Sequence, residues 1–268
     1  MNTDNLITAV LALRKARRVV VYTGAGVSAE SGIPTFRDAE GFWQRFPPEQ
    51  FAQWSGLFNM VLIEPRRVAE FVLNVVEPIA LAKPNAGHLA IGGLEQYVPT
   101  TVVTQNIDGL HQAAGSNEVH EIHGSIWEVV DVSNGRLVHR FTRDQLAAIA
   151  AALRAYFEER ESAIRLLSVL RRLYPFDWLG HHRPNLVLFG DSLAEPAWTK
   201  AEQTARNCDV MISVGTSGEV YPAAFIPQYA AAAGATVIKI DPKSCVGCWL
   251  EGNAGTILPE LVRVAWGS

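Results

Sequence analysis

The stretch Val19-Val20-Val21-Tyr22-Thr23-Gly24-Ala25-Gly26-Val27-Ser28-Ala29 decides how this chain folds. Residues 19–22 are all apolar, which is typical of a parallel strand that is buried on both faces. The glycines that follow fit the pattern G-x-G-x-x-A, in which a strand turns tightly into a helix and the backbone approaches a pyrophosphate. A purely structural turn uses the same glycines, so the pattern alone leaves both interpretations open.

A second predicted strand ends in polar residues. The apolar, β-branched run Tyr97–Val103 leads into Thr104-Gln105-Asn106-Ile107-Asp108-Gly109-Leu110-His111, and His123-Gly124-Ser125 follows close behind. In open α/β sheets, ligands bind at the carboxyl ends of the strands. Two amides, a carboxylate and an imidazole at such an end therefore predict a reaction site.

Strands and helices alternate along most of the remaining chain. We predict a helix that starts at Thr3 or Asp4, and further helices over 65–76, 83–94, 198–207 and 229–233. Strands are predicted over 183–189, 209–214 and 236–240, with one or two short strands in 125–137 around a turn at 133–135. A second glycine-rich loop, Gly215-Thr216-Ser217-Gly218, follows the strand over 209–214. The alternation predicts an α/β protein with a Rossmann-like, doubly wound parallel sheet and a smaller, largely helical inserted domain.

Two segments interrupt this alternation. In Ser31–Arg37 a glycine and a proline end any helix early, and no second βα repeat with an acidic residue about 20 positions on can be found, which disfavours a hydride-transferring dehydrogenase. Asp38–Gln53 is expected to be an irregular, mobile loop able to cover a ligand. Arg143–Leu173 is predicted to be one helix or a helical hairpin. Its expected core residues are Leu146, Ile149, Ala150, Leu153, Phe157, Ile164, Leu167 and Leu170.

Composition limits the remaining classes of protein. The 268 residues carry a formal net charge of −4, so no basic field is expected to recruit nucleic acid. The first ten residues lack the features of a secretory signal, and no apolar run approaches the ~18 residues needed to span a bilayer, so no membrane partner is expected. Three cysteines form no disulfide framework, which favours a reducing, cytoplasmic location.

The motifs together resemble those of sirtuins, the NAD-dependent protein lysine deacylases. The matching stretches run in family order along most of the chain: 24–37, 104–111, 123–125, Arg183-Pro184 with Phe189-Gly190, and 215–217. The resemblance implies a reaction that yields nicotinamide, deacylated lysine and O-acyl-ADP-ribose. An NAD glycohydrolase or mono-ADP-ribosyltransferase using the same pocket, and a non-catalytic NAD-binding module, remain as alternatives.

The resemblance also implies a role for each matching residue. His123 is expected to be the general base, because an imidazole with a pKa near ~6.5 suits proton transfer at neutral pH. Asn106 and Asp108 are expected to share the catalytic site, whereas His88 and His120 are expected to be structural. The residues expected to bind NAD are Gly24, Ala25, Gly26, Ser28, Thr35, Phe36, Arg37, Gln105, Asn106, Asp108, Gly215, Thr216, Ser217 and Asp241. The family more often has Asn at the last of these positions.

The acylated lysine is expected to meet His123 between two extended segments. The residues expected to bind the peptide are Val187, Phe189, Gly190, Glu219, Val220 and Tyr221. Leu188 and the stretch 191–193 depart from the family pattern, which leaves the peptide preference open. Val72 and Val75 occupy positions where the desuccinylase-like branch carries Tyr and Arg, so acetyl or longer apolar acyl groups are expected to be preferred.

The largest departure from the family concerns zinc. Sirtuins usually carry four cysteines between the His-Gly-Ser and Arg-Pro motifs, but residues 125–183 contain none. His139, His181 and His182 are badly spaced for a closed tetrahedral site. No zinc is therefore expected, with helix packing in 143–173 taking its place. The Rossmann-like domain is expected to comprise 1–37, 83–126 and 183–268, and the small domain 38–82 and 127–182.

Overall fold

The computed structural model describes residues 3–35, 42–173, 181–243 and 246–267. The chain forms two compact units. The first unit comprises Met1–Thr35, Lys83–His123 and Leu193–Ser268, and the second comprises Phe36–Ala82 and Gly124–Ser192. Relative to the expected domain boundaries, residues 124–126 and 183–192 lie in the second unit, because β4 (Gly124–Asp131) pairs with β6 (His182–Leu186).

The first unit is built on a six-stranded sheet in the order β3-β2-β1-β7-β8-β9. The strands are β1 (Val19–Thr23), β2 (Thr100–Thr104), β3 (Val119–Glu121), β7 (Val210–Val214), β8 (Thr236–Asp241) and β9 (Cys248–Glu251). All neighbouring strands pair in parallel, and the order reverses between β1 and β7. This is the strand order of dinucleotide-binding sheets, whose ligands bind where the order reverses. The Rossmann-like, doubly wound fold is therefore confirmed.

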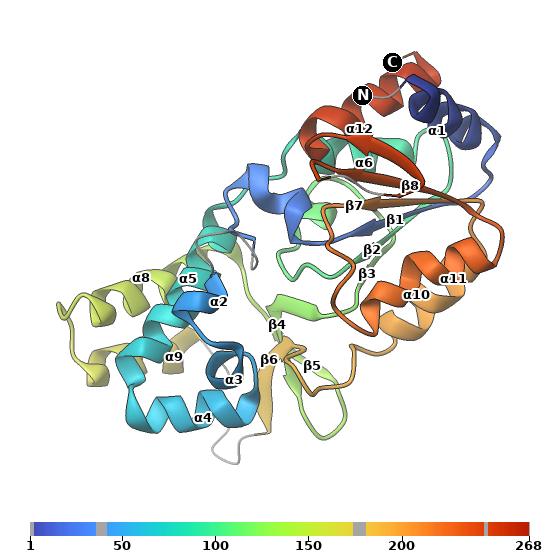
Figure 1. The fold of residues 1–268 in the computed structure, drawn as a ribbon. Helices are drawn as coiled ribbons and strands as arrows, with labels where there is room; N and C mark the ends of the chain where they lie inside the picture. The colour runs from blue at the N-terminus through green and yellow to red at the C-terminus, as the bar shows by residue number, and fades with distance from the viewer. Residues whose placement is uncertain (1–2, 36–41, 174–180, 244–245, 268) are drawn as a thin grey trace. The chain divides into compact units, whose positions relative to one another are not determined.

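Helices cover both faces of this sheet (Figure 1). On one face lie α1 (Thr3–Lys15), α6 (Ala86–Leu94) and α12 (Ala254–Trp266), and on the other lie α10 (Ala197–Arg206) and α11 (Ile226–Ala232). Successive β1 residues alternate between the two layers of core, with Val19 and Val21 in one and Val20 and Tyr22 in the other. Burial on both faces explains why β1 is a continuous apolar run.

The second unit combines helices with a three-stranded antiparallel sheet in the order β5-β4-β6, in which β5 is Leu137–Arg140. Its helices are α2 (Phe42–Arg45), α3 (Pro48–Phe51), α4 (Trp54–Ile63), α5 (Pro65–Leu81), α8 (Arg143–Phe157) and α9 (Ala163–Leu173). Phe46, Phe51 and Met60 form a small aromatic core under the first three helices. The inserted unit is thus helical with a sheet of its own.

Several predicted elements differ from those in the structure. The strand predicted over Tyr97–Val103 begins only at Thr100, because Tyr97 N–H still bonds to the Leu94 carbonyl at the end of α6. The prediction of an irregular loop over Asp38–Gln53 is wrong for the described residues of that segment, because α2 and α3 lie there. The strand expected over 183–189 ends at Leu186, where pairing with β4 stops.

The segment Arg143–Leu173 forms a helical hairpin, one of the two predicted arrangements. The buried face of α8 contains Leu146, Ile149, Ala150, Leu153 and Tyr156, not the expected Phe157. In α9, Ile164 and Leu167 are 80% and 51% exposed, so the prediction that they belong to the core is wrong. The hydrophobic spacing therefore predicted the helices better than it predicted the face that α9 buries.

Within the described ranges, no helix is both long and apolar enough to cross a membrane.

Candidate active site

Two glycine loops meet at the carboxyl ends of β1 and β7. The N–H of Gly26 donates to the Gly215 carbonyl at 2.9 Å. A Cβ atom on Gly24 would lie 2.7 Å from the same carbonyl oxygen, and one on Gly26 would lie 2.7 Å from the Gly215 Cα. Gly215 itself has φ +63°, in the left-handed region that favours glycine. The first loop continues into the short 3-10 helix η1 (Ala25–Ser31), so the backbone of both loops lies at the point where the strand order reverses.

Ser28 joins the first loop to the polar stretch after β2. The Asn106 side-chain amide donates to Ser28 Oγ at 3.1 Å, and this hydroxyl donates to Asp108 Oδ2 at 2.7 Å. The other carboxylate oxygen of Asp108 accepts the N–H of Leu110 at 2.9 Å. All three side chains are buried. The structure thus brings together one serine, one amide and one carboxylate that the sequence places in separate motifs.

Asp108 occupies an environment that favours its neutral form. Burial raises the pKa of its carboxyl, and the hydrogen bonds from Leu110 N–H and the Ser28 hydroxyl oppose this shift. The groups that lower it are hydrogen-bond donors of the backbone and the Ser28 hydroxyl. The site therefore holds its carboxyl by directional hydrogen bonds.

His123 follows β3 and is oriented by the backbone. Its Nδ1 lies 3.0 Å from the Gln105 carbonyl oxygen, which only accepts, so Nδ1 carries the proton and Nε2 keeps its lone pair. Burial lowers the pKa of His123, although the bond to Gln105 opposes the shift. The Gln105 side chain donates to Thr216 Oγ1 at 2.9 Å, which connects this group to the second glycine loop. A neutral imidazole with a bare Nε2 is suited to accept a proton.

His88 takes part in the cap of α6. The Asn85 side chain caps α6, and His88 Nδ1 accepts the Asn85 N–H at 3.4 Å to complete a capping box. Burial lowers the pKa of His88 to about 4, so this ring is neutral. Its Nε2 also lies 3.4 Å from Ser28 Oγ.

The remaining predicted residues are spread over both units. Ala25 lies in η1, Ser217 lies in the second glycine loop, and Asp241 ends β8, where its Oδ1 accepts the Lys243 N–H at 2.7 Å. Thr35 is half-buried, whereas Phe36 and Arg37 lie outside the described residues. Residues 219–221 belong to the first unit, and Tyr221 there is 62% exposed.

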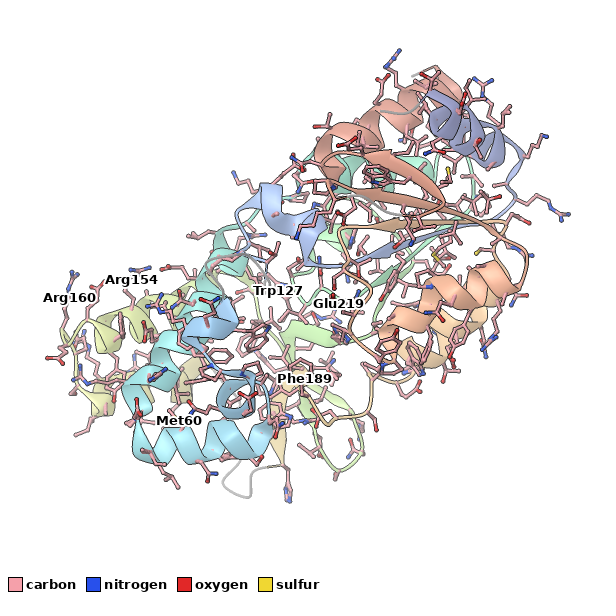
Figure 2. The ribbon with its side chains drawn as sticks, in the orientation of Figure 1. Met60, Trp127, Arg154, Arg160, Phe189 and Glu219 are labelled. Carbon is pink, nitrogen blue, oxygen red and sulfur yellow. The ribbon has the colours of Figure 1, made fainter. Side chains whose placement is uncertain are left out.

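Five predicted substrate residues lie in the second unit. Val72 and Val75 are half-buried on α5. Val187, Phe189 and Gly190 follow β6, where Phe189 N–H bonds to the Ala52 carbonyl at 2.8 Å and its ring lies 6.2 Å from that of Trp43. Figure 2 shows Phe189 beside β6. Glu219 and Val220 join Tyr221 in the first unit, so the structure does not bring the predicted peptide-binding segments together within one unit.

Three buried polar residues were not assigned roles from the sequence. Thr23 and Thr104 are the last residues of β1 and β2 and face each other in register, and His111 lies in the adjacent helix α7 (Leu110–Ala113). All three are at most 2% exposed. A hydroxyl at the final position of two adjacent buried strands is the sequence signal that points to them.

The described residues of the second unit do not form the cysteine-rich zinc site of sirtuins. Its β4–β6 region offers histidines in place of thiolates. The His139 ring packs on Phe141 at 5.0 Å, and His182 faces Asp131 across the sheet. Among the residues that the structure describes, no group of three or more His, Cys, Asp or Glu side chains is arranged to hold a metal ion. A structural zinc needs four converging donors, and the described part of this region brings no such set together.

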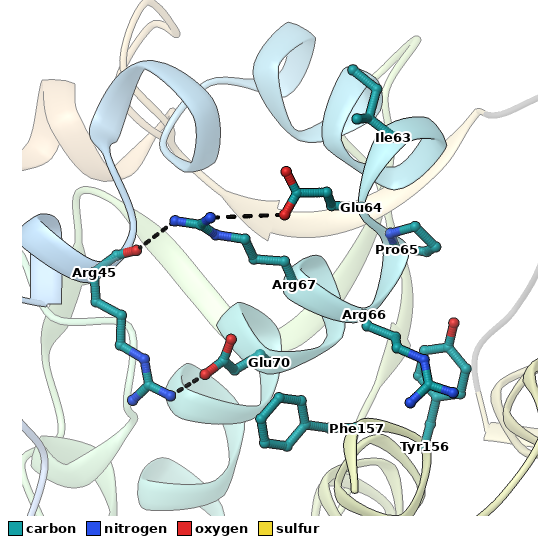
Figure 3. Close-up of a pocket in the computed structure, with 9 residues that line it drawn as sticks. All are labelled: Arg45, Ile63, Glu64, Pro65, Arg66, Arg67, Glu70, Tyr156 and Phe157. Atoms are coloured by element: carbon teal, nitrogen blue, oxygen red, sulfur yellow. Dashed lines mark hydrogen bonds and ion pairs between the residues drawn. The ribbon is translucent and has the colours of Figure 1, made fainter. Parts of the chain in front are cut away.

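A cavity of about 560 Å³ lies in the second unit, and none of the residues that line it is a predicted site residue (Figure 3). Its arginines are engaged: Arg45 pairs with Glu70, Arg66 with Glu159, and Arg67 with Glu64. The Arg66 guanidinium also lies 5.2 Å from the ring centroid of Tyr156. The cavity is therefore lined by satisfied charges and carries no candidate catalytic group.

The strand order, the paired glycine loops and the polar cluster at the strand ends define a Rossmann-like fold of the dinucleotide-binding class. Residues 24–222 match the model of the Sir2 family. The chain belongs to the Sir2 family, as the resemblance of its motifs to those of sirtuins predicts.

Relatives and solved structures agree with this assignment. The chain is 39% identical over 257 residues to NAD-dependent protein deacylase 2 of Pyrobaculum aerophilum, covering 94% of this chain and 92% of that protein. It is similar to a Sir2 homologue solved as a complex with NAD, with a TM-score of 0.75, 30% identity and coverage of 97% and 93% of the two chains. It is also similar to Sir2Af2 bound to a myristoylated histone peptide, with a TM-score of 0.67, 29% identity and coverage of 98% and 97%.

Proposed function

We propose that this protein is an NAD-dependent protein lysine deacylase that releases nicotinamide, deacylated lysine and O-acyl-ADP-ribose. The observation that carries the proposal is the buried Asn106–Ser28–Asp108 cluster beside His123, whose Nε2 keeps its lone pair. A module that only binds NAD does not require a base at this position. The P. aerophilum relative, which is named as a deacylase, supports the same reaction class.

The residues present fit NAD. Gly24, Gly26 and Gly215 let the two loops pack closely against each other at the reversal point of the sheet, where pyrophosphates bind in this fold. Gln105, Asn106 and Asp108 supply amide and carboxyl groups that can pair with a carboxamide and with ribose hydroxyls. When bound, NAD supplies the glycosidic bond that is broken and the ADP-ribosyl group that accepts the acyl group. Asp241, at the end of β8, is proposed to contact ribose hydroxyls.

His123 is proposed to remove a proton from a ribose hydroxyl through Nε2. Because burial holds the pKa of His123 below its ordinary value of 6.5, the ring is neutral at pH 7 and gains a proton only under more acidic conditions. Activity should therefore fall on acidification, with the acidic limb of the kcat/KM profile centred below pH 6.5. A limb centred above pH 7 would contradict this assignment.

The acyl preference is proposed from α5. Val72 and Val75 offer no cation or hydrogen-bond donor to a terminal carboxylate, and burying an unpaired charge is costly. Acetyl and longer apolar acyl groups are therefore proposed as substrates. Residues 187–190, after β6, and residues 219–221 are proposed to pair with the peptide backbone. The myristoylated peptide on Sir2Af2 supports an apolar acyl group on a protein lysine.

We also propose that the second unit folds without zinc. Helix α8 buries an apolar stripe against α5 where the family uses a metal, and Arg143 NH1 donates to the Ala80 and Ala82 carbonyls at 2.7 and 2.9 Å. These bonds satisfy groups at the C-terminal end of α5 that would otherwise lack partners. Elemental analysis of purified protein should find well under one zinc per chain, and activity should survive a chelator; one tightly held zinc per chain would refute the proposal.

A cytoplasmic location is proposed from the thiols. Cys208 and Cys248 are free, and burial raises the pKa of both, which keeps them as unreactive thiols. Fractionation of the source cells should recover the protein with the cytoplasmic fraction.

The function is tested with one peptide carrying acetyl, butyryl, myristoyl or succinyl lysine, incubated with NAD and analysed by mass spectrometry. Nicotinamide release should require the acyl peptide, succinyl should be removed more slowly than the apolar groups, and His123→Ala should lose about 10²–10⁴-fold in rate. His120→Gln, a buried histidine outside the cluster, is the matched control and should stay near the unaltered chain. Nicotinamide release without peptide would indicate a glycohydrolase, and NAD binding without turnover would indicate a binding module.

A further inference from the structure

A chain of buried groups runs behind Asn106 and is not used by the roles assigned above. His111 Nε2 lies 2.9 Å from Thr23 Oγ1, and Thr23 Oγ1 donates to Thr104 Oγ1 at 2.8 Å. Thr104 Oγ1 also accepts the backbone N–H of Asn106 at 3.0 Å. The three side chains therefore connect α7 to the backbone of the residue whose amide bonds to Ser28.

The direction of each bond fixes the state of His111. Thr23 gives its only proton to Thr104, which leaves its oxygen to accept from the imidazole, so His111 carries its proton on Nε2. Burial, with a contribution from His88, lowers the pKa of His111 to about 3, in agreement with a neutral ring. Nδ1 is buried and has no hydrogen-bond partner among the described residues. The ring thus acts as a single donor aimed at the two threonines.

The hydrogen bonds that link His111, Thr23 and Thr104 hold one end of the turn after β2, and Asp108 holds the other. Asp108 Oδ1 accepts the N–H of Leu110, the first residue of α7, two residues after the carboxyl itself. Thr23 and Thr104 are paired in register at the ends of β1 and β2, so His111 binds to the sheet at the point where the turn leaves it. A shift of the His111 ring would therefore move the Asn106 backbone relative to Ser28.

We propose that His111, acting through Thr23 and Thr104, is a positioning residue that fixes Asn106 for cleavage of the nicotinamide bond. The inference rests on the proposed function. His111 touches neither of the predicted substrates; it acts by preorganising a group that does. Loss of its N–H donor should lower kcat by about 10- to 100-fold, because small misplacements of a reacting geometry have effects of that size. The KM for the acyl peptide should change little.

The test compares four variants that separate the donor from the bulk of the side chain. His111→Leu removes the donor, and His111→Gln retains an N–H that can reach Thr23. Thr23→Val removes the linking hydroxyl with almost no change of shape, and the double variant His111→Leu/Thr23→Val completes a cycle. We would measure kcat and KM for acyl-peptide-dependent nicotinamide release, together with thermal unfolding, and use His120→Gln as the control.

The expected result has three parts. Thr23→Val and His111→Leu each lower kcat, His111→Gln restores most of it, and the double variant is no slower than the slower single variant, since both act through one chain. Full kcat in Thr23→Val, or strictly additive losses in the cycle, would overturn the proposal, and so would a His111→Gln variant as slow as His111→Leu. Thr23→Val keeps the test informative even if the leucine variant does not fold. Failure of the proposed function is a separate outcome, because the unaltered chain would then show no acyl-peptide-dependent release.

Discussion

The two units bury their interiors in different ways. In the first unit, the strand ends enclose polar groups that are hydrogen-bonded to one another: Ser28 with Asn106 and Asp108, and His111 Nε2 with the threonines. In the second unit, α8 presents an apolar stripe to the apolar face of α5, and its ion pairs lie at the surface. Figure 2 labels two of these surface arginines, Arg154 on α8 and Arg160 just after that helix.

This difference sets what each region tolerates. Buried hydrogen bonds depend on distance and direction, and a lost partner leaves a desolvated group behind. Apolar contacts depend mainly on area and volume, so swaps that conserve volume have small effects. We therefore expect the polar strand ends of the first unit to be sensitive to the loss of single hydrogen-bonding atoms and to pH. The apolar contact between α5 and α8 should be sensitive to changes in side-chain volume.

The largest expected effect on stability lies in the second unit. Leu146→Ala empties a position on α8 that is 2% exposed and should lower the free energy of unfolding by about 2–5 kcal/mol. Ile164→Ala on α9 is the matched control, because that side chain is 80% exposed and its loss should change stability by less than about 0.5 kcal/mol. Denaturant unfolding at pH 7.5 measures both. Equal losses in the two variants would show that α9 packs as the hydrophobic spacing alone suggests.

An intermediate loss of stability is expected when the pH is lowered, because of two buried histidines in the first unit. His88 and His111 have folded-state pKa values of about 4 and about 3, against 6.5 when unfolded, so the unfolded chain binds more protons below pH 6.5. Stability should therefore fall as the pH is lowered from 6.5, by about 1.4 kcal/mol per pH unit for each histidine. Asp108 opposes this loss because its pKa is raised, and His120 and His123 add to it.

The variant His111→Gln isolates one histidine from these other groups. Between pH 6.5 and 5, the unaltered chain should lose about 2 kcal/mol more than this variant, since one fewer proton is taken up on unfolding. Denaturant titrations of both proteins at a series of pH values give the difference directly. Parallel curves would mean that His111 is protonated in the folded chain.

The sequence predicted the first unit well because its signals are local. β1 and β7 are apolar runs followed by glycine loops, and alternating helices and strands predicted the doubly wound parallel sheet, but the short edge strands β3 and β9 were not predicted. The start of β2 was misplaced because a turn of backbone bonds after α6 takes up Tyr97 and Val98. In the second unit, the helical hairpin was one of two open arrangements, since periodicity does not show where a chain reverses.

The candidate site divides in the same manner. Motifs identified Ser28, Asn106, Asp108 and His123, but only the fold shows that Ser28 lies between the other two cluster residues. The sequence places His111 in the motif Thr104–His111 but does not predict its role, because its contact with Thr23 joins residues that are 88 positions apart. The face that α9 buries depends on its neighbours in three dimensions, which hydrophobic spacing does not report.

The smallest expected effects compare two arginines of α8. Arg143 donates to two carbonyls at the C-terminal end of α5, whereas Arg154 forms an exposed ion pair with Glu77. Arg143→Ala should lower the free energy of unfolding by about 1 kcal/mol, because backbone acceptors lose their donor, and this loss should persist at high salt. Arg154→Ala should cost less, and its effect should vanish as salt screens the pair. Denaturant unfolding at two salt concentrations decides the comparison. If Arg154→Ala lowered the free energy of unfolding more than Arg143→Ala, or by an amount that salt does not reduce, the exposed ion pair would be the stronger link between α5 and α8.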